Sequence, residues 1–308
     1  MIIIVVMNIL SFDVGGTTIK YGLVNQDFEV LSKGSIETPD NENNFLNIID
    51  TVASKYLDKF EKISIAMPGF VSKKESKYLY GTNIKYEIDF KKLEGFEPSK
   101  FSIDNDGNVA AYAEYQLNYK NKVENLIMLT FGTGIGGGII SNGKILRGGS
   151  NAGELGHILI SDDSQIQCNC GKRGCLESIV SARSWTEQCN VLSQNEPESE
   201  LAIRFSEQNL GSVLFDEKIK LTSEQILSRD IIISYISRGL VSIFEIFNNE
   251  LFVLGGSMSS QPYSLLNLIK DNIDSNFTFT ARVFPEIKIS KFKSDSGVIG
   301  SALLAQND

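Results

Sequence analysis

The stretch GELGHILISDDSQIQCNCGKRGCLE, residues 153–177, contains the only histidine of the chain and three of its four cysteines. Neutral imidazole and thiolate sulfur together form a tetrahedral ligand set for zinc. Four side chains of this kind lie here: His157, Cys168, Cys170 and Cys175. Gly171 and Gly174 allow tight backbone turns between the last two cysteines. The stretch therefore predicts a closed structural zinc site, with the carboxylates of Glu154 and Glu177 beside it.

A disulfide loop or a group of small core residues is the alternative interpretation of the same cysteines. Cys168 and Cys170 are too close in sequence to pair comfortably, and clustered thiols without a secretory signal favour a metal. Residues 162–175 are also too polar for a protein core. Cys189 stands apart in a stretch with helical periodicity, and for it a core role is the better interpretation.

The composition of the chain limits its class and its partners. With 308 residues and 42% hydrophobic content, it is long enough for two domains that share a cleft. A net charge of −9 would repel nucleic-acid phosphates and anionic lipid, and no basic run offsets this charge. We therefore expect neither a nucleic-acid partner nor a membrane partner.

The first residues do not have the pattern of a targeting segment. Residues 1–6 are apolar, but the run is short and lacks a basic flank, so we expect a first strand. Met1 or Met7 is the physiological start. No other run approaches the roughly 20 apolar residues of a membrane helix, and the cysteine usage suits a reducing compartment. A cytoplasmic location is expected.

A glycine turn follows the strand expected at residues 8–12. Gly15 and Gly16 connect this strand to the next one, and a plain hairpin turn is the alternative interpretation. Threonine hydroxyls, backbone amides and Lys20 surround the two glycines, which indicates a nest for an anion. Asp13 is in position to hold a hydrated magnesium ion.

A polar turn at residues 104–108 connects a short strand to a helix expected at 109–117. Asn105 and Asp106 would lie where the strand ends and the helix begins. The alternative role for Asp106 is that of a helix cap, which is a common use of aspartate.

A second glycine turn, residues 132–138, follows the strand expected at 126–131. Its letters match the dinucleotide-binding fingerprint, but a strand follows it in place of the helix that would bind a pyrophosphate. We interpret it as the other half of a clamp on a triphosphate. Gly255 and Gly256, after a further strand, would let a flat ring lie on the backbone, and a plain loop is the alternative. No GxxxxGK[ST] motif occurs, which excludes a P-loop kinase.

The remaining segments predict a mixed sheet with helical crossovers. Four further segments are expected: helices at 43–60, 176–190 and 230–247, and a polar insertion at 194–208. We expect one domain over residues 1–118 and a second over 119–296. A last helix, 297–308, is expected to pack back on the first domain.

Taken in order, these motifs resemble those of the ROK family of sugar kinases, repressors and related proteins, and the similarity covers essentially the whole chain. It rests on seven motifs: DVGGTTIK (13–20), MPG (67–69), NDGN (105–108), GTGIGGG (132–138), GELGH (153–157), CNCGKRGCLE (168–177) and LGG (254–256). Each motif alone is weak, but seven in this order are specific. The resemblance implies an α/β fold of the actin/hexokinase (ribonuclease H-like) type, with duplicated α/β domains and a cleft between them.

The resemblance also implies an activity, namely ATP-dependent phosphorylation of a hexose hydroxyl to the sugar 6-phosphate, with Asp106 as general base. The sugar would be of the glucose or N-acetylmannosamine type. Residues implied to bind the sugar are Asn105, Asp106, Glu154, His157 and Glu177. Residues implied to bind ATP and its Mg²⁺ are Asp13, Gly15, Gly16, Thr17, Lys20, Thr133, Gly134, Gly136, Gly137, Gly255 and Gly256. The family binds Zn²⁺ through residues that match His157, Cys168, Cys170 and Cys175, and a homodimer is implied in the same way.

Two other functions within the same family are a sugar-responsive transcriptional regulator and a non-catalytic sugar sensor. Such regulators carry a helix-turn-helix before the first glycine turn, whereas twelve residues precede Asp13 here. The acidic charge also disfavours DNA binding. The presence of Asp106 and of both glycine turns disfavours a sensor. The chain departs from the family at Gly107, where alanine is usual, and at residues 248–250, where an Asp-Pro pair is frequent.

Overall fold

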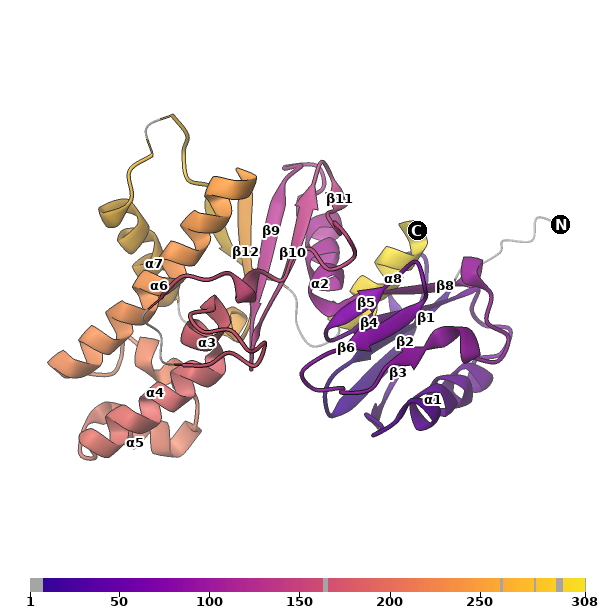
Figure 1. Ribbon diagram of the computed structural model, residues 1–308, viewed down its shortest axis with the longest axis horizontal. Coiled ribbons are helices and arrows are strands. Elements are labelled where there is room, and N and C mark those ends of the chain that lie inside the picture. Colours follow the sequence, from indigo (N-terminus) through magenta and orange to yellow (C-terminus); the bar gives the residue numbers. More distant parts are fainter. Residues whose placement is uncertain (1–7, 163–165, 261–262, 280, 292–295, 308) are drawn as a thin grey trace. The chain divides into compact units, whose positions relative to one another are not determined.

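The structure is a computed structural model that describes residues 8–162, 166–260, 263–279, 281–291 and 296–307. Within these residues, two five-stranded sheets share one strand order, 3-2-1-4-5, when the strands of each are numbered along the chain (Figure 1). The first sheet consists, in this order, of β3 (Val30–Glu37), β2 (Thr18–Val24), β1 (Ile9–Val14), β4 (Lys62–Met67) and β8 (Phe101–Asn105). The second consists of β11 (Lys144–Ile145), β10 (Ile135–Ser141), β9 (Leu126–Phe131), β12 (Leu251–Gly256) and β13 (Glu286–Ile289). The repeated order confirms the prediction of duplicated α/β sheets.

The two faces of the first sheet are covered by different helices. Side chains alternate along β1, which pairs antiparallel with β2 and parallel with β4. Leu10 and Phe12 point into a core that includes Phe45 of α1 (Glu42–Lys55). Ile9 points to the other face and packs against Val298 of α8 (Ser296–Asn307).

Serine side chains bring α8 close to the first sheet. Ser11 Oγ of β1 donates to the carbonyl oxygen of Val298 at 2.6 Å, and Ser64 Oγ of β4 lies 2.6 Å from Ser301 Oγ. The helix α8 also packs against α2 (Asp106–Glu114), which continues into a π-helical turn at Tyr115–Tyr119. The last helix, α8, therefore packs on the first sheet, which is formed by the N-terminal part of the chain (Figure 1).

A small three-stranded sheet is inserted between β4 and β8. It consists of β5 (Phe70–Ser72), β6 (Lys77–Tyr80) and β7 (Ile88–Asp89). Tyr78 of β6 is fully buried, and its hydroxyl lies 2.9 Å from the carbonyl oxygen of Ile84 and 3.2 Å from that of Pro68. This contact fixes the turn that follows β4.

In the second sheet, β9, β12 and β13 are parallel. The described part of the connection from β11 to β12 contains four α-helices: α3 (Leu176–Val180), α4 (Ala182–Asn195), α5 (Glu200–Gln208) and α6 (Ser223–Phe247). The helix α7 (Tyr263–Asn276) connects β12 to β13. This sheet therefore repeats the strand order of the first.

Local capping explains where the helices differ from the expected ranges. The single helix expected at 176–190 is interrupted at Ser181, whose backbone is extended and whose side chain caps α4. The stretch expected as a polar insertion, 194–208, contains α5, which Ser199 caps and which buries Phe205. The helix α6 begins before residue 230 because Thr222 and Gln225 form a capping box.

The contacts divide the chain into two compact units. The first comprises residues 1–124, 138–153 and 291–308, and the second comprises residues 125–137 and 154–290. The sequence-based domains, 1–118 and 119–296, differ from these units mainly in residues 138–153. The expected strand at residues 1–6 and the choice between Met1 and Met7 lie outside the described residues. In the part of the chain that is described, every helix is too short or too polar to cross a membrane.

Candidate active site

The turn between β1 and β2 brings the first group of predicted nucleotide-binding residues together. Gly15 N donates a hydrogen bond to the Thr18 carbonyl oxygen at 2.9 Å, which closes the turn. Thr38 Oγ1 donates to the Gly15 carbonyl oxygen at 2.7 Å. Gly16 and Thr17 are exposed. A Cβ on Gly16 would lie 2.7 Å from Asn83 Cβ, so this close approach favours glycine. The turn is therefore bound by Thr38 at the Gly15 carbonyl oxygen and packs against Asn83 at Gly16.

Asp13 and Lys20 flank this turn. They are antiparallel partners in β1 and β2, and the Asp13 carboxylate packs so closely on Gly297 of α8 that a Cβ there would overlap it. Burial raises the pKa of Asp13 above its ordinary value of 3.8, and the positive charge of Lys20 opposes that rise. A cation at this position would favour the charged carboxylate.

Asn105 is the N-cap of α2. Its Oδ1 accepts hydrogen bonds from the backbone N–H groups of Gly107 (2.8 Å) and Asn108 (3.2 Å), and its Nδ2 donates to the Gly69 carbonyl oxygen at 3.0 Å. Asp106, the first residue of the helix, is exposed, and its Oδ1 shares the Gly107 N–H at 2.8 Å. The capping role considered for Asp106 is thus filled by its neighbour.

Two residues that the sequence analysis missed hold this turn. Asp104 is buried and accepts hydrogen bonds from Asn108 Nδ2 and from the Asn105 backbone, both at 2.8 Å. Arg147 Nε donates to its other carboxylate oxygen at 2.8 Å, and Arg147 Nη2 lies 2.7 Å from the same oxygen. Arg147 is the only charged residue between Lys144 and Glu154. A single charge in such a stretch is the sequence signal that could have indicated a role for Arg147.

The turn between β9 and β10 holds the second group. Its backbone closes through a 2.8 Å hydrogen bond from Gly132 N to the Gly134 carbonyl oxygen, and Thr133 is exposed at the tip. Gly136 and Gly137 follow within β10. A Cβ on Gly136 would lie 2.7 Å from Thr130 Oγ1, so glycine is favoured there.

Gly255 and Gly256 lie at the end of β12, next to this second turn. Gly256 is the register partner of Phe131 in β9, and its φ of +67° is a left-handed conformation that glycine adopts easily. A Cβ on Gly256 would overlap the Phe131 carbonyl oxygen, which accepts a hydrogen bond from Ser257 Oγ at 2.8 Å. Gly256 is therefore exposed beside the end of β9, where the turn begins, whereas Gly255 is buried within β12.

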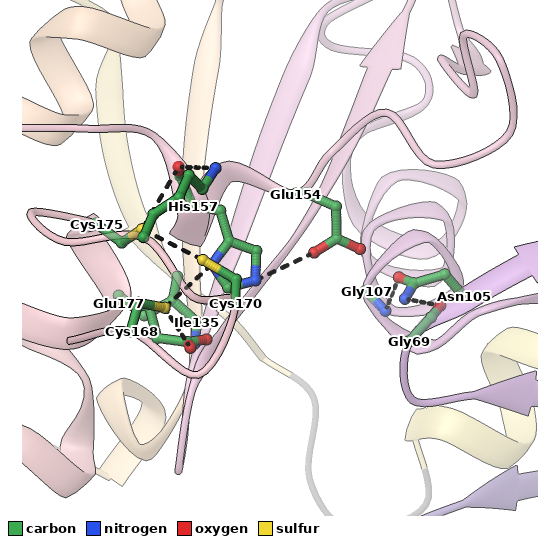
Figure 2. Close-up of polar contacts among 11 residues, drawn as sticks. Gly69, Asn105, Gly107, Ile135, Glu154, His157, Cys168, Cys170, Cys175 and Glu177 are labelled. Carbon is green, nitrogen blue, oxygen red and sulfur yellow. Dashed lines mark hydrogen bonds and ion pairs between the residues drawn. The ribbon is translucent and has the colours of Figure 1, made fainter. Parts of the chain in front are cut away.

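The predicted metal ligands converge in the second unit. The ligand atoms of His157, Cys168, Cys170 and Cys175 all lie within 4.8 Å of one another. Cys175 is the N-cap of α3, and His157 ends a short 3₁₀ turn at Leu155–His157. Gly174 has a φ of +78°, and a Cβ there would overlap the Ser161 carbonyl oxygen. Figure 2 shows the three sulfurs around the imidazole.

The donor set fits Zn²⁺. Three sulfurs and one imidazole nitrogen are the ligands of a closed structural zinc site. The four cysteines are free, and Cys170 Sγ lies 3.6 Å from Cys175 Sγ. Burial raises the pKa of the Cys168 thiol to about 12 and also raises the pKa of Cys175. A metal ion would offset this rise, because metal binding favours the thiolate.

The two ring nitrogens of His157 face different neighbours. Nδ1 lies 3.5 Å from Cys168 Sγ, whereas Nε2 lies 3.9 Å from Glu154 Oε2 (Figure 2). Burial raises the pKa of the Glu154 carboxyl; the charge of His157 opposes this rise and that of Glu177 adds to it. Nδ1 is thus placed to bind a metal, and Nε2 faces the Glu154 carboxylate.

Glu177 connects the cysteine cluster with the second glycine turn. Its Oε2 accepts a hydrogen bond from Ile135 N at 2.9 Å, and its Oε1 lies 3.5 Å from Cys168 Sγ. Both carboxylate oxygens therefore have a protein neighbour.

The structure groups the predicted residues unit by unit. In the first unit, β1, β4 and β8 are parallel, so Asp13, Met67 and Asn105 lie at the same edge of the sheet. In the second unit, β9 and β12 are parallel, and Thr133 and Gly256 lie at their carboxyl ends. Such edges are where ligands bind in open α/β sheets.

Known sugar kinases are similar to this chain along nearly its full length. The chain is 30% identical over 312 residues to a glucokinase of Halalkalibacterium halodurans, covering 96% of this chain and 94% of that protein. It is 29% identical over 315 residues to an N-acetylmannosamine kinase of Haemophilus influenzae, with 96% and 94% covered. A ROK family glucokinase of Streptomyces griseus, solved with glucose and AMPPNP, superposes with a TM-score of 0.80 at 24% identity, covering 98% of this chain and all of that one.

This structural likeness confirms the predicted actin/hexokinase-type fold. The model of the ROK family matches residues 9–308. The match spans both sheets, both glycine turns and the cysteine cluster. The chain therefore belongs to the ROK family.

Proposed function

We propose that this chain transfers the terminal phosphoryl group of ATP to the 6-hydroxyl of a glucose-type or N-acetylmannosamine-type sugar, with Asp106 as general base. The chain is an ATP-dependent sugar kinase. Its similarity along nearly its full length to a glucokinase and to an N-acetylmannosamine kinase supports this activity. The observation that carries the role of Asp106 is its exposure at the start of α2, where Asn105 serves as the cap.

The two glycine turns would bind the phosphates of ATP. Backbone amides in such turns form anion-binding concavities. The turn at Gly15–Thr17 belongs to the first unit and the turn at Thr133–Gly137 to the second, with Lys20 beside the first. Mg²⁺ carried by ATP would neutralise phosphate charge, and Asp13 is the carboxylate that would hold it. Gly255 and Gly256 would border the adenosine.

Asp106 would accept the proton of the sugar hydroxyl. A hydroxyl is a poor nucleophile, and a carboxylate within hydrogen-bond reach contributes about 10²-fold to 10⁴-fold to the rate. Phosphoryl transfer otherwise depends on positioning and on charge neutralisation. The network of Asp104 and Arg147 supports this role, since it fixes the turn that carries Asp106.

The sugar would be bound by Asn105, Asp106, Glu154, His157 and Glu177. Each amide or carboxylate can keep one hydrogen-bonding site for the sugar. Asn105 Nδ2, for example, uses one N–H on Gly69 and has a second. Exclusion of water from the bound sugar and ATP would suppress hydrolysis of ATP.

His157, Cys168, Cys170 and Cys175 would hold Zn²⁺. The metal, when bound, supplies structural cross-linking of the loop and no chemistry in the transfer step. Because Cys175 caps α3, which carries Glu177, and His157 lies three residues after Glu154, this loop fixes both sugar-binding carboxylates.

The identity of the sugar can be tested directly. Purified protein is given ATP and Mg²⁺ with glucose, N-acetylmannosamine, N-acetylglucosamine, fructose or a β-glucoside, and ADP release is measured. We expect turnover with glucose or N-acetylmannosamine and formation of the 6-phosphate. No turnover with any sugar, together with sugar binding, would favour the sensor; sugar-dependent binding of DNA would favour the regulator. A homodimer stays a prediction, which light scattering would measure.

A further inference from the structure

We propose that Glu177 is a positioning residue that couples the cysteine cluster to the second glycine turn, so that metal occupancy and nucleotide affinity are linked. The inference rests on the proposed function in one respect, because it assigns this turn to ATP phosphates. All the residues involved belong to the second unit.

The carboxylate of Glu177 lies between the two structures that it would couple. Its Oε2 accepts the Ile135 N–H at 2.9 Å, and its Oε1 lies 3.5 Å from Cys168 Sγ. Figure 2 shows the Glu177 side chain together with Ile135 and Cys168. A movement of the cysteine loop would therefore reach the turn through a single side chain.

Two further contacts hold the same turn from the same segment of the chain. Gly156, one residue before His157, packs on the Ile135 carbonyl group so closely that a Cβ would overlap its oxygen. Ala182 N, at the start of α4, donates to the Gly132 carbonyl oxygen at 3.0 Å. The turn is thus held at both ends by the segment that carries the metal ligands and the helices after it.

Contacts from outside the turn matter because the turn is rich in glycine, although one hydrogen bond, from Gly132 N to the Gly134 carbonyl oxygen, closes it. Glycine loses more conformational freedom on ordering than any other residue. A turn that is already ordered binds a ligand more tightly than one that must be ordered by the ligand. Loss of the Glu177 contact should therefore weaken nucleotide binding even in the absence of sugar.

The negative charge of Glu177 has the opposite effect, because it repels phosphate. Glutamine separates the two contributions: it keeps an oxygen for the Ile135 N–H and removes the charge. If the hydrogen bond dominates, Glu177→Ala weakens binding while Glu177→Gln preserves it. If charge repulsion dominates, both variants bind nucleotide more tightly than the wild type.

The experiment measures the Kd of the magnesium complex of AMPPNP, without sugar, for zinc-loaded wild type, Glu177→Ala and Glu177→Gln. Glu187→Ala, an exposed glutamate of α4, is the matched control. We expect the Kd to rise about 10-fold in Glu177→Ala, which loses one hydrogen bond, and to change little in the other two variants. Amide exchange of Ile135 should be faster in Glu177→Ala, and removal of zinc by a chelator should accelerate the same amide.

A double-mutant cycle isolates the contact. A Cβ on Gly134 would overlap Glu177 Oε2, and Gly134 does not have a left-handed φ, so alanine is compatible with its backbone. Gly134→Ala should weaken AMPPNP binding in the wild type and much less in Glu177→Ala, because the carboxylate it displaces is already absent.

The proposal is overturned if Glu177→Ala, with normal zinc content, shows an unchanged AMPPNP Kd and unchanged Ile135 exchange. A fall in sugar affinity alone would make Glu177 a sugar contact only. Additive effects in the cycle would also contradict the coupling. Failure of the proposed function looks different: the wild type would not bind AMPPNP, while the exchange of Ile135 would still report whether Glu177 and zinc hold the turn.

Discussion

Adjacent side chains in the turn at residues 104–108 have separate roles. Asp104 is buried and anchors the turn, Asn105 caps α2 and binds Gly69, and Asp106 is exposed. The sequence predicted that Asn105 and Asp106 lie where a strand ends and a helix begins, and the structure places them there. The sequence could not identify the anchor, because Arg147 lies 43 positions after Asp104 and only the fold brings the two together.

Replacement of Arg147 should destabilise the protein and slow its reaction. Arg147→Ala leaves the Asp104 carboxylate, whose side chain is 5% exposed, without its cation. Breaking a buried pair in this way costs about 3 kcal/mol in the free energy of unfolding. Urea denaturation measures this loss, and kcat should fall with little change in KM. The double variant Asp104→Asn with Arg147→Ala should recover part of the stability, because no buried charge is left unpaired. A fully stable Arg147→Ala would contradict the role of this pair.

The Asp13 carboxylate should lower the stability of the fold, although the proposed function needs it to hold Mg²⁺. Because burial raises its folded-state pKa above 3.8, the folded state binds the proton more tightly than the unfolded state. The carboxylate therefore costs stability above the folded-state pKa, and this cost disappears as the pH falls toward 3.8. We expect Asp13→Asn to be more stable than the wild type at neutral pH, with a difference that shrinks in acid, and its kcat with MgATP to fall about 100-fold.

Thermal unfolding across pH and steady-state kinetics measure these two effects. Asp27→Asn, at an exposed position in the same unit, is the control and should change neither quantity. An Asp13→Asn variant that is less stable at neutral pH would show that the carboxylate stabilises the fold.

At the scale of elements, the sequence predicted features that depend on residues close together in the chain, and it missed helix boundaries that depend on single capping residues. Sulfur and imidazole ligands within a short stretch predicted the cluster that the structure assembles. Periodicity could not locate the interruption between α3 and α4, because the extended backbone of Ser181 ends α3 and its side chain caps α4. It also missed α5, whose polar surface resembles a loop and whose buried face is short.

The cysteine loop should bind about one zinc ion per chain, measured by elemental analysis of the purified protein. Cys175→Ser should lose this metal, while Cys189→Ser should keep it, because Cys189 lies outside the cluster and contacts the Gly211 carbonyl oxygen. Structural zinc contributes on the order of 10 to 16 kcal/mol in small peptides, so chelation should lower the unfolding temperature. Metal-free protein with full thermal stability would contradict the zinc site.

At the scale of the whole molecule, the two sheets repeat one topology, and each has a glycine turn after its first strand. The sequence indicated this duplication through those turns and through the resemblance of seven motifs to one family. It could not fix the division into units, because residues 138–153 follow the second turn in sequence but group by contacts with the first sheet. Arg147, which binds Asp104, belongs to this segment.

The central claim is that Asp106 accepts the proton of the sugar hydroxyl. The most direct measurement is kcat for sugar phosphorylation by Asp106→Asn, in an assay coupled to ADP release, alongside the Kd of the sugar and of AMPPNP. Asparagine keeps the size and one oxygen of the side chain but cannot accept the proton, so we predict that kcat falls about 10²-fold to 10⁴-fold. Both Kd values should stay near those of the wild type. A variant that phosphorylates the sugar at the wild-type rate would contradict the account.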